Sequence, residues 1–189
     1  MKGLIVTTDG FEDSEFSYPF YRLEEAGFEV DVATPGAEPV EGKHGYEFEA
    51  DAGVEDHDPE WWAEKYDLLV VPGGGAPESL RTEAPEAADV VAAFDEAGKP
   101  IASICHGAQL LISAGIVEDR EVTGYWPLEV DIENAGAEYV DEPAVVDDNL
   151  VTARYPADLP AFMQATFEVL GWDGAASGEG AAEPATPSA

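Results

Sequence analysis

The single cysteine of this chain, Cys105, stands where a side chain could act as a nucleophile. It follows the apolar segment 101–104 and precedes His106 and Gly107 at the start of an expected helix. A sharp strand-to-helix turn presents such a side chain, and small neighbours relieve the crowding. The start of a helix also favours the thiolate, the form that attacks carbonyl carbons. The alternative is a buried cysteine that packs as a small hydrophobic residue.

Of the three histidines, only His106 is adjacent to the thiol. It could act as a base or stabilise the thiolate as an imidazolium. Neighbouring helical residues point about 100° apart, so the His106 ring needs another group to aim it. The alternative is a histidine bonded to a neighbouring loop. We interpret His44, in the segment 42–45, as a turn residue, and His57, which lies among acids, as solvated.

A glycine triplet could contribute backbone donors to the same site. Residues 73–75 follow the apolar segment 67–72 and open a loop that we expect to extend to residue 78. Their amides could form an oxyanion hole. A phosphate-binding loop is the rival interpretation, and the missing P-loop lysine disfavours it. A plain turn is the third possibility.

Two acids after the first apolar segment, Glu12 and Glu15, could face the same crevice. A carboxyl beside Cys105 either donates a proton to the sulfur or, when ionised, raises the thiol pKa. Alternatively, these acids complement a helix dipole. No group of residues has the spacing of a metal site, so we predict no metal and no cofactor.

Apolar strand segments alternate with amphipathic helical segments, an order that predicts a parallel sheet with helices on both faces. Ligands in such sheets bind beyond the carboxyl ends of the strands, where the loops of Glu15, Gly74 and Cys105 would meet. We predict one domain over residues 1–171 and a disordered tail over 172–189, where small residues, Pro and Glu dominate. The expected strands are 1–8, 28–33, 67–72, 100–104, 121–125, 138–140 and 150–153, with a hairpin at 40–50. The expected helices are 16–27, 58–65, 85–97, 106–114 and 158–170.

The charge balance restricts the partners. The chain has 41 Asp and Glu against 8 Lys and Arg, a net charge of −33. This charge repels phosphates, so we expect neither nucleic-acid binding nor association with an anionic membrane. No apolar run reaches the roughly 20 residues of a membrane span, and the N-terminus lacks the layout of a secretory signal. We expect a cytoplasmic protein, and the acidity suggests a salt-rich cytoplasm, where the Debye length falls to about 3 Å at 1 M salt.

Several segments, in this order along the chain, resemble the DJ-1/PfpI superfamily, and most closely its PfpI branch of intracellular cysteine peptidases and deglycases. They are 11–15 (FEDSE), 42–46 (GKHGY), 71–78 (VPGGGAPE), 102–107 (ASICHG) and 154–159 (RYPADL). The resemblance covers about residues 1–170. It implies a flavodoxin-like three-layer α/β sandwich.

The resemblance also implies roles for individual residues. Cys105 corresponds to the nucleophile, His106 to its catalytic partner and Glu15 to the carboxyl that hydrogen-bonds the thiol. The amides of Gly74 and His106 correspond to the oxyanion hole. Glu78 corresponds to an acid that orients the histidine of a neighbouring subunit, which would solve the problem of aiming the ring.

Three further residues correspond to the family's substrate pocket: Glu12, Gly75 and Tyr125. Gly75 differs from PfpI proteins, which carry a larger residue at this position. Members of the branch form dimers and hexamers without a cofactor, so the resemblance implies a homo-oligomer.

These features favour a cysteine-dependent hydrolase that acts on peptides or removes small carbonyl adducts from proteins. One alternative is a cofactor-independent glyoxalase that converts methylglyoxal to lactate. Another is a non-catalytic stress protein that senses oxidants through Cys105. A glutaminase subunit ranks last, because His44 and His57 precede the cysteine instead of following it.

Overall fold

A computed structural model of the protein describes residues 1–172. A seven-stranded sheet forms its centre, and only the β10–β11 pair in this sheet is antiparallel. In spatial order its strands are β10 (Val145–Asp147), β11 (Leu150–Ala153), β7 (Ile101–Ile104), β6 (Leu68–Val71), β1 (Lys2–Val6), β2 (Glu29–Thr34) and β5 (Ala52–Gly53).

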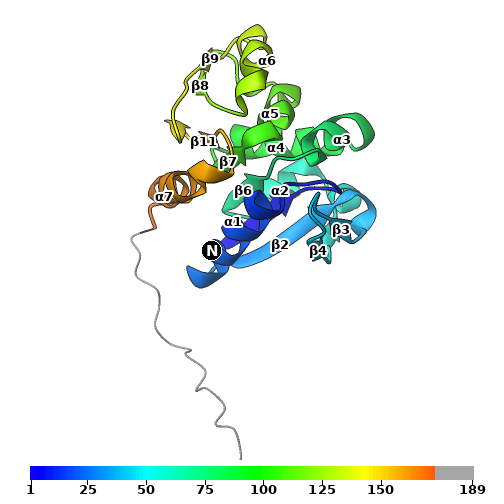
Figure 1. Ribbon diagram of the computed structural model, residues 1–189. Helices are drawn as coiled ribbons and strands as arrows, with labels where there is room; N and C mark the ends of the chain where they lie inside the picture. The colour runs from blue at the N-terminus through cyan, green and yellow to red at the C-terminus, as the bar shows by residue number, and fades with distance from the viewer. Residues whose placement is uncertain (173–189) are drawn as a thin grey trace, which may run out of the picture.

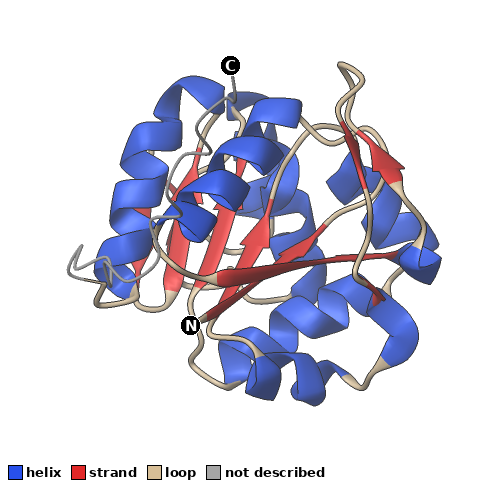
Figure 2. Ribbon diagram, turned by 90° about the horizontal axis from the view of Figure 1, so that it is seen from below, coloured by secondary structure: helices blue, strands red, loops and turns tan. Residues whose placement is uncertain are grey.

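Helices cover both faces of this sheet (Figures 1 and 2). They are α1 (Asp13–Glu25), α2 (Pro59–Lys65), α3 (Ala76–Glu83), α4 (Glu86–Glu96), α5 (Ala108–Ala114), α6 (Glu129–Asn134) and α7 (Leu159–Val169). Helices α1 and α7 pack on one face, and α2, α4 and α5 contribute to the core on the other. The predicted flavodoxin-like three-layer sandwich is confirmed.

The strands nearest the site are apolar because both of their faces are covered. Every residue of β6 and β7 is buried. Strands that pass between two helical layers lose the alternation of exposed and buried residues. Their carboxyl ends lead into Pro72 and Cys105, so the two loops that follow begin side by side.

Two small ribbons lie outside the central sheet. The predicted hairpin at 40–50 is present as the antiparallel pair β3 (Val40–Glu41) and β4 (Glu47–Phe48). A parallel pair, β8 (Glu121–Val122) and β9 (Glu138–Tyr139), lies near α6.

Some elements differ from the sequence-based expectation. Helix α1 begins at Asp13, three residues earlier than expected, and continues through Pro19. The sequence predicts a loop up to residue 78, whereas the structure has helix α3 from Ala76. Only Ala76, Pro77 and Leu80 of its eight residues are buried, so the sequence lacks a clear apolar stripe there. Helix α6 and strands β5 and β10 were also missed, since two to six residues show too little periodicity.

Trp172, the last described residue, lies with its ring 4.5 Å from that of Phe167 in α7. The predicted division of the chain after residue 171 stays a prediction. The rest of the predicted tail, 173–189, lies outside the described residues.

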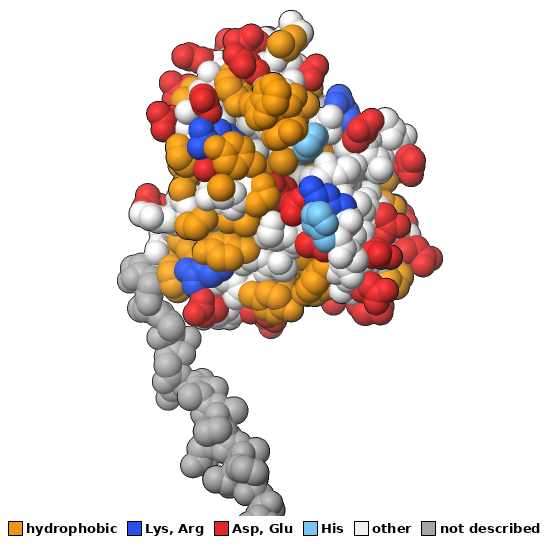
Figure 3. Space-filling model, in the orientation of Figure 1, with side chains coloured by type: hydrophobic (Ala, Val, Ile, Leu, Met, Phe, Trp, Pro, Cys, Tyr) orange, Lys and Arg blue, Asp and Glu red, His pale blue; other side chains and the backbone are white. Residues whose placement is uncertain are grey.

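Acidic side chains are spread over the visible face of the molecule, with apolar side chains between them (Figure 3). Within residues 1–172, no helix combines the length and the apolar character that crossing a membrane requires.

Candidate active site

Cys105 lies at a sharp corner between β7 and α5. Its φ angle is 62°, a left-handed conformation that costs a residue with a side chain roughly 1–2 kcal/mol. A short 3₁₀ turn, Cys105–Gly107, then leads into α5. A Cβ atom at Gly107 would lie 2.4 Å from Ser103 Oγ and 2.7 Å from the Val71 carbonyl oxygen. The corner therefore requires glycine at this position.

The loop after β6 brings backbone donors to the thiol. The backbone amides of Gly74 and His106 both act on the sulfur and lower the pKa of Cys105. Gly73 allows this convergence, because a Cβ atom there would lie 2.7 Å from Cys105 Cβ and 2.5 Å from Glu15 Oε2.

The same loop is tied to the loop after β1. Glu12 N–H donates to the Gly73 carbonyl at 3.1 Å, and Gly75 N–H donates to the Gly10 carbonyl at 2.8 Å. Gly74 has φ 82°, and a Cβ atom there would lie 2.4 Å from Glu12 N. These bonds place Glu12 beside the thiol corner. The Gly75 amide points into the loop contact instead of toward the sulfur.

Glu15 is fully buried beside Cys105, in the first turn of α1. Its Oε2 accepts the Gly73 N–H at 3.0 Å, while Oε1 has no hydrogen-bond partner among the described residues. Burial raises the pKa of Glu15 to about 7, although hydrogen bonds from Cys105 and Gly73 oppose the shift. This carboxyl can therefore take up or release a proton near neutral pH.

The sequence predicts that the helix start favours the thiolate and that an ionised carboxyl beside Cys105 raises the thiol pKa, and the carboxyl has the larger effect. Burial, followed by the nearby Glu15 carboxylate, raises the pKa of Cys105 to about 12. The two amide donors do not outweigh these effects. Near neutral pH the thiol therefore keeps its proton, next to a carboxyl that titrates in this range.

The His106 ring lies against both the sulfur and an aromatic side chain. Its Nδ1 is 3.4 Å from Cys105 Sγ, and its ring centroid is 4.7 Å from that of Tyr125. Burial lowers the pKa of His106, Lys43 adds to this shift, and Glu78 opposes it. The ring is therefore poised as a neutral base next to the thiol.

Glu78 lies on α3 with an exposed side chain. Within residues 1–172 of one chain, Glu78 and His106 form no hydrogen bond, although the charge of Glu78 influences the ring. The resemblance assigns Glu78 to the histidine of a neighbouring subunit, so this role stays a prediction.

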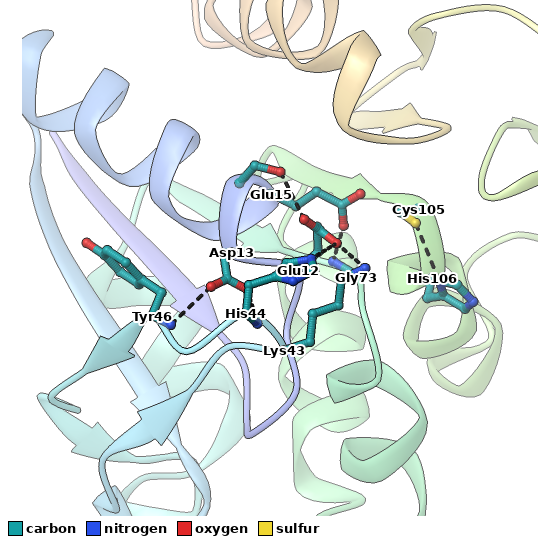
Figure 4. A network of polar contacts seen from close by, with 10 residues as sticks. Glu12, Asp13, Glu15, Lys43, His44, Tyr46, Gly73, Cys105 and His106 are labelled. Carbon is teal, nitrogen blue, oxygen red and sulfur yellow. Dashed lines mark hydrogen bonds and ion pairs between the residues drawn. The ribbon is translucent and has the colours of Figure 1, made fainter.

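Lys43 is a site residue that the sequence analysis missed. Its ammonium group forms an ion pair with Glu12, whose other oxygen accepts the Ser14 hydroxyl at 3.2 Å (Figure 4). His44 Nε2 lies 4.0 Å from the same Glu12 carboxylate. In the sequence, Lys43 could have been noticed as one of only eight Lys and Arg residues, in a turn that glycines flank.

The third histidine lies away from this site. His57 is exposed, as expected, but its ring stacks on Trp61 with centroids 3.5 Å apart, so it is not simply solvated. Within residues 1–172, no group of three or more His, Cys, Asp or Glu side chains is arranged to hold a metal ion.

The structure thus brings together Cys105, His106, Glu15, Gly74 and Glu12. Tyr125 joins them through the His106 ring and through its own N–H, which donates to the Cys105 carbonyl at 3.1 Å. Thiol, carboxyl, imidazole and two amides within one corner can support attack on a carbonyl carbon and the accompanying proton transfers.

Comparison with known proteins places this arrangement in a family. A profile described as the DJ-1/PfpI family matches residues 1–169. Deglycase TK1284 of Thermococcus kodakarensis is 44% identical over 170 residues, which cover 90% of this chain and 99% of the relative. Protein/nucleic acid deglycase 2 of Escherichia coli is 40% identical over 169 residues, which cover 88% of this chain and 96% of the relative.

The fold comparison agrees with the sequence comparison. The structure of Schizosaccharomyces pombe DJ-1 superposes with a TM-score of 0.81 at 26% identity, and covers 89% of this chain and 90% of that one. Since the profile and the relatives span almost all of the described residues, the chain belongs to the DJ-1/PfpI family.

Proposed function

We propose that this protein is a cysteine-dependent deglycase or related hydrolase, in which Cys105 attacks the carbonyl carbon of a small adduct or peptide. The observation that carries the proposal is the convergence of two backbone amides and the buried Glu15 carboxyl on one sulfur at a strained corner. The names of the relatives TK1284 and E. coli deglycase 2 support a deglycase over a peptidase.

The chemistry begins with the thiol proton. Glu15, with a pKa of about 7, takes the thiol proton as Cys105 Sγ forms a bond to the carbonyl carbon. The C=O electron pair moves to the oxygen, where the amides of Gly74 and His106 stabilise the negative charge. In a peptide amide, collapse breaks the carbon–nitrogen bond, and the amine leaves with a proton delivered through His106. In a methylglyoxal hemiaminal, the sulfur instead displaces the protonated amine from the carbon that bears the hydroxyl group, and a proton shift from this carbon to the neighbouring ketone carbon gives the thioester. Water then adds to the thioester carbon, releases the acid and returns a proton to sulfur.

The exposed Glu78 fits the assembly that the family resemblance implies. We propose that the protein forms a homo-oligomer in which Glu78 of a second copy accepts a hydrogen bond from His106. The supporting observation is that Glu78 is exposed on α3, where a second copy can reach it. Tyr125, against the His106 ring, would then hold the imidazole from its other side.

A glyoxalase reaction is the second candidate, and the titration of Glu15 favours it. Isomerising the thiol adduct of methylglyoxal requires a base that moves a proton from C1 to C2, and a carboxyl with a pKa of about 7 can do so. No net oxidation occurs, and water releases lactate from the sulfur.

The test compares the wild type with Cys105→Ala. Three reactions are followed: release of methylglyoxal adducts from a modified lysine peptide, hydrolysis of a peptide amide, and formation of lactate from free methylglyoxal. We expect adduct release to be the fastest of the three and to fall at least about a thousandfold in the variant. Undiminished adduct release by Cys105→Ala would refute the proposal, and lactate formation as the fastest reaction would favour the glyoxalase.

A further inference from the structure

The turn between β3 and β4 is tied to the start of α1 by backbone hydrogen bonds. Asp13 accepts the N–H groups of His44 and Tyr46, each at 3.0 Å. The N–H of Lys43 itself donates to the Phe11 carbonyl at 2.9 Å. Three bonds therefore fix a turn that would otherwise be free to move with its hairpin.

Gly42 shows how closely the turn is packed. A Cβ atom there would lie 2.7 Å from Asp13 Oδ2 and 2.9 Å from the Phe11 ring. The turn can approach α1 this closely only with glycine at position 42. The three hydrogen bonds and the close packing at Gly42 thus fix the backbone position of Lys43.

The turn between β3 and β4 places the Lys43 ammonium group next to the corner at Cys105. The group pairs with Glu12, and the charges of Glu15 and Cys105 also act on it (Figure 4). An ammonium has three N–H donors, and the pair with Glu12 uses one of them. The Lys43 side chain is 47% exposed, so its other donors remain accessible from solvent.

This placement matters because the rest of the chain repels anions. The net charge is −33, and one of its negative charges, that of Glu12, lies beside the thiol corner. In concentrated salt the long-range repulsion is screened, so charges in contact with the substrate decide its preference. Lys43 neutralises Glu12 at that point.

We propose that Lys43 is a specificity-determining residue that admits electrophiles carrying a negative charge to Cys105, and that Asp13 is the residue that positions it. The inference rests on the proposed role of Cys105 as nucleophile and names the substrate class: small carbonyl compounds with a carboxylate or similar group. Without Lys43, Glu12 is an uncompensated negative charge that repels this class and leaves neutral electrophiles less affected.

The test uses two alkylating agents that differ in charge, iodoacetate and iodoacetamide. With either one, the thiolate forms a sulfur–carbon bond, iodide leaves with the bonding electrons, and the thiol proton passes to solvent. Cys105 is the only cysteine, so the mass increase of the intact protein reports its reaction alone. The ratio of the two rates measures charge preference without requiring any particular carbonyl substrate.

We expect Lys43→Met to lower the iodoacetate/iodoacetamide ratio about fourfold, as for one unit charge at roughly 5 Å in water. Lys43→Arg should keep the ratio near that of the wild type, and Glu12→Gln should raise it. Lys65→Met is the matched control, because Lys65 lies over Trp61 on α2, outside this site, and its loss changes the net charge equally. Its ratio should remain that of the wild type.

The positioning role of Asp13 is tested by comparing its variant with the Lys43 variant. We expect Asp13→Ala to lower the ratio as Lys43→Met does, and to lower it no further in the double variant. A purely structural role would lower the melting temperature of Asp13→Ala and leave the ratio unchanged.

The outcomes separate this inference from the proposed function. An unchanged ratio in Lys43→Met, or an equal fall in Lys65→Met, would overturn the role of Lys43 while Cys105 remains a nucleophile. Absence of alkylation in the native wild type by either reagent would overturn both.

Discussion

Two buried carboxylates in this fold have opposite surroundings. Asp158, 7% exposed, receives two hydrogen bonds from the Arg154 guanidinium, at 2.8 and 3.1 Å. Glu15, 0% exposed, receives one backbone N–H and has one oxygen without a hydrogen-bond partner among the described residues. One acid is satisfied by a cation, and the other is left to share a proton with a thiol.

The difference separates structural from chemical use of a buried acid. A guanidinium fork satisfies the charge of Asp158, and the interaction raises the pKa of Arg154, so the guanidinium keeps its charge. Burial without a bonded cation raises the pKa of Glu15 to about 7. Such an unpaired group destabilises the fold and gains reactivity in return.

The largest expected effect is on turnover in Glu15→Gln. The glutamine amide can still accept the Gly73 N–H, but it cannot take the proton of Cys105. We expect kcat/KM for adduct release to fall by about 10²–10⁴. The rate of iodoacetamide alkylation at neutral pH should not fall, because removal of the carboxylate charge lowers the thiol pKa.

The turnover and the alkylation rate together distinguish a role of Glu15 in proton transfer from a role in thiol reactivity. Loss of both turnover and alkylation would mean that Glu15 only maintains the shape of the corner. Asp158→Asn is the control for a buried acid outside the reactive corner, and its turnover should remain within a few-fold of the wild type.

The second prediction concerns stability against pH. The folded-state pKa of Glu15 is raised from 4.5 to about 7, so the folded state binds this proton more tightly than the unfolded state. The penalty is absent below about pH 4.5, grows as pH rises, and is complete above about pH 7, where it reaches about 3 kcal/mol.

The measurement is denaturant unfolding of the wild type and Glu15→Gln in concentrated salt. We expect the wild type to lose about 3 kcal/mol of unfolding free energy relative to the variant between about pH 4.5 and 8. Taking the difference between the two proteins cancels the contribution of the many other acids. Parallel curves across this range would show that Glu15 is not the buried titrating group.

The sequence predicted the central sheet and the strand-to-helix corner at Cys105 well, because both depend on local patterns. Apolar segments such as 68–71 and 101–104 can only be covered strands in a chain of this kind, and Cys105 follows one of them directly. The raised pKa of Glu15, by contrast, could not be predicted from the sequence. It depends on how deeply Glu15 is buried, which comes from helix α7 and the strands packing around α1.

Lys43 was missed for a related reason. Its position depends on Asp13, thirty residues away, which accepts backbone N–H groups that any residue type could donate. A sequence pattern cannot reveal such bonds. The family motif at 42–46 pointed to this turn, but only the structure shows that the turn places Lys43 beside Glu12.

The smallest expected effect is on stability in Asp158→Asn. The amide keeps one acceptor for Arg154 but removes the negative charge, and Arg154 retains its 2.7 Å bond to Asp141. We expect a loss of about 2 kcal/mol in unfolding free energy, less than the roughly 3–5 kcal/mol for breaking a buried pair, because the guanidinium stays partly compensated. Denaturant unfolding at about pH 7 measures this loss. Glu15→Gln should have the opposite sign under the same conditions. If both variants were destabilised alike, a bonded and an unbonded carboxylate would contribute equally, and the distinction between the two acids would fail.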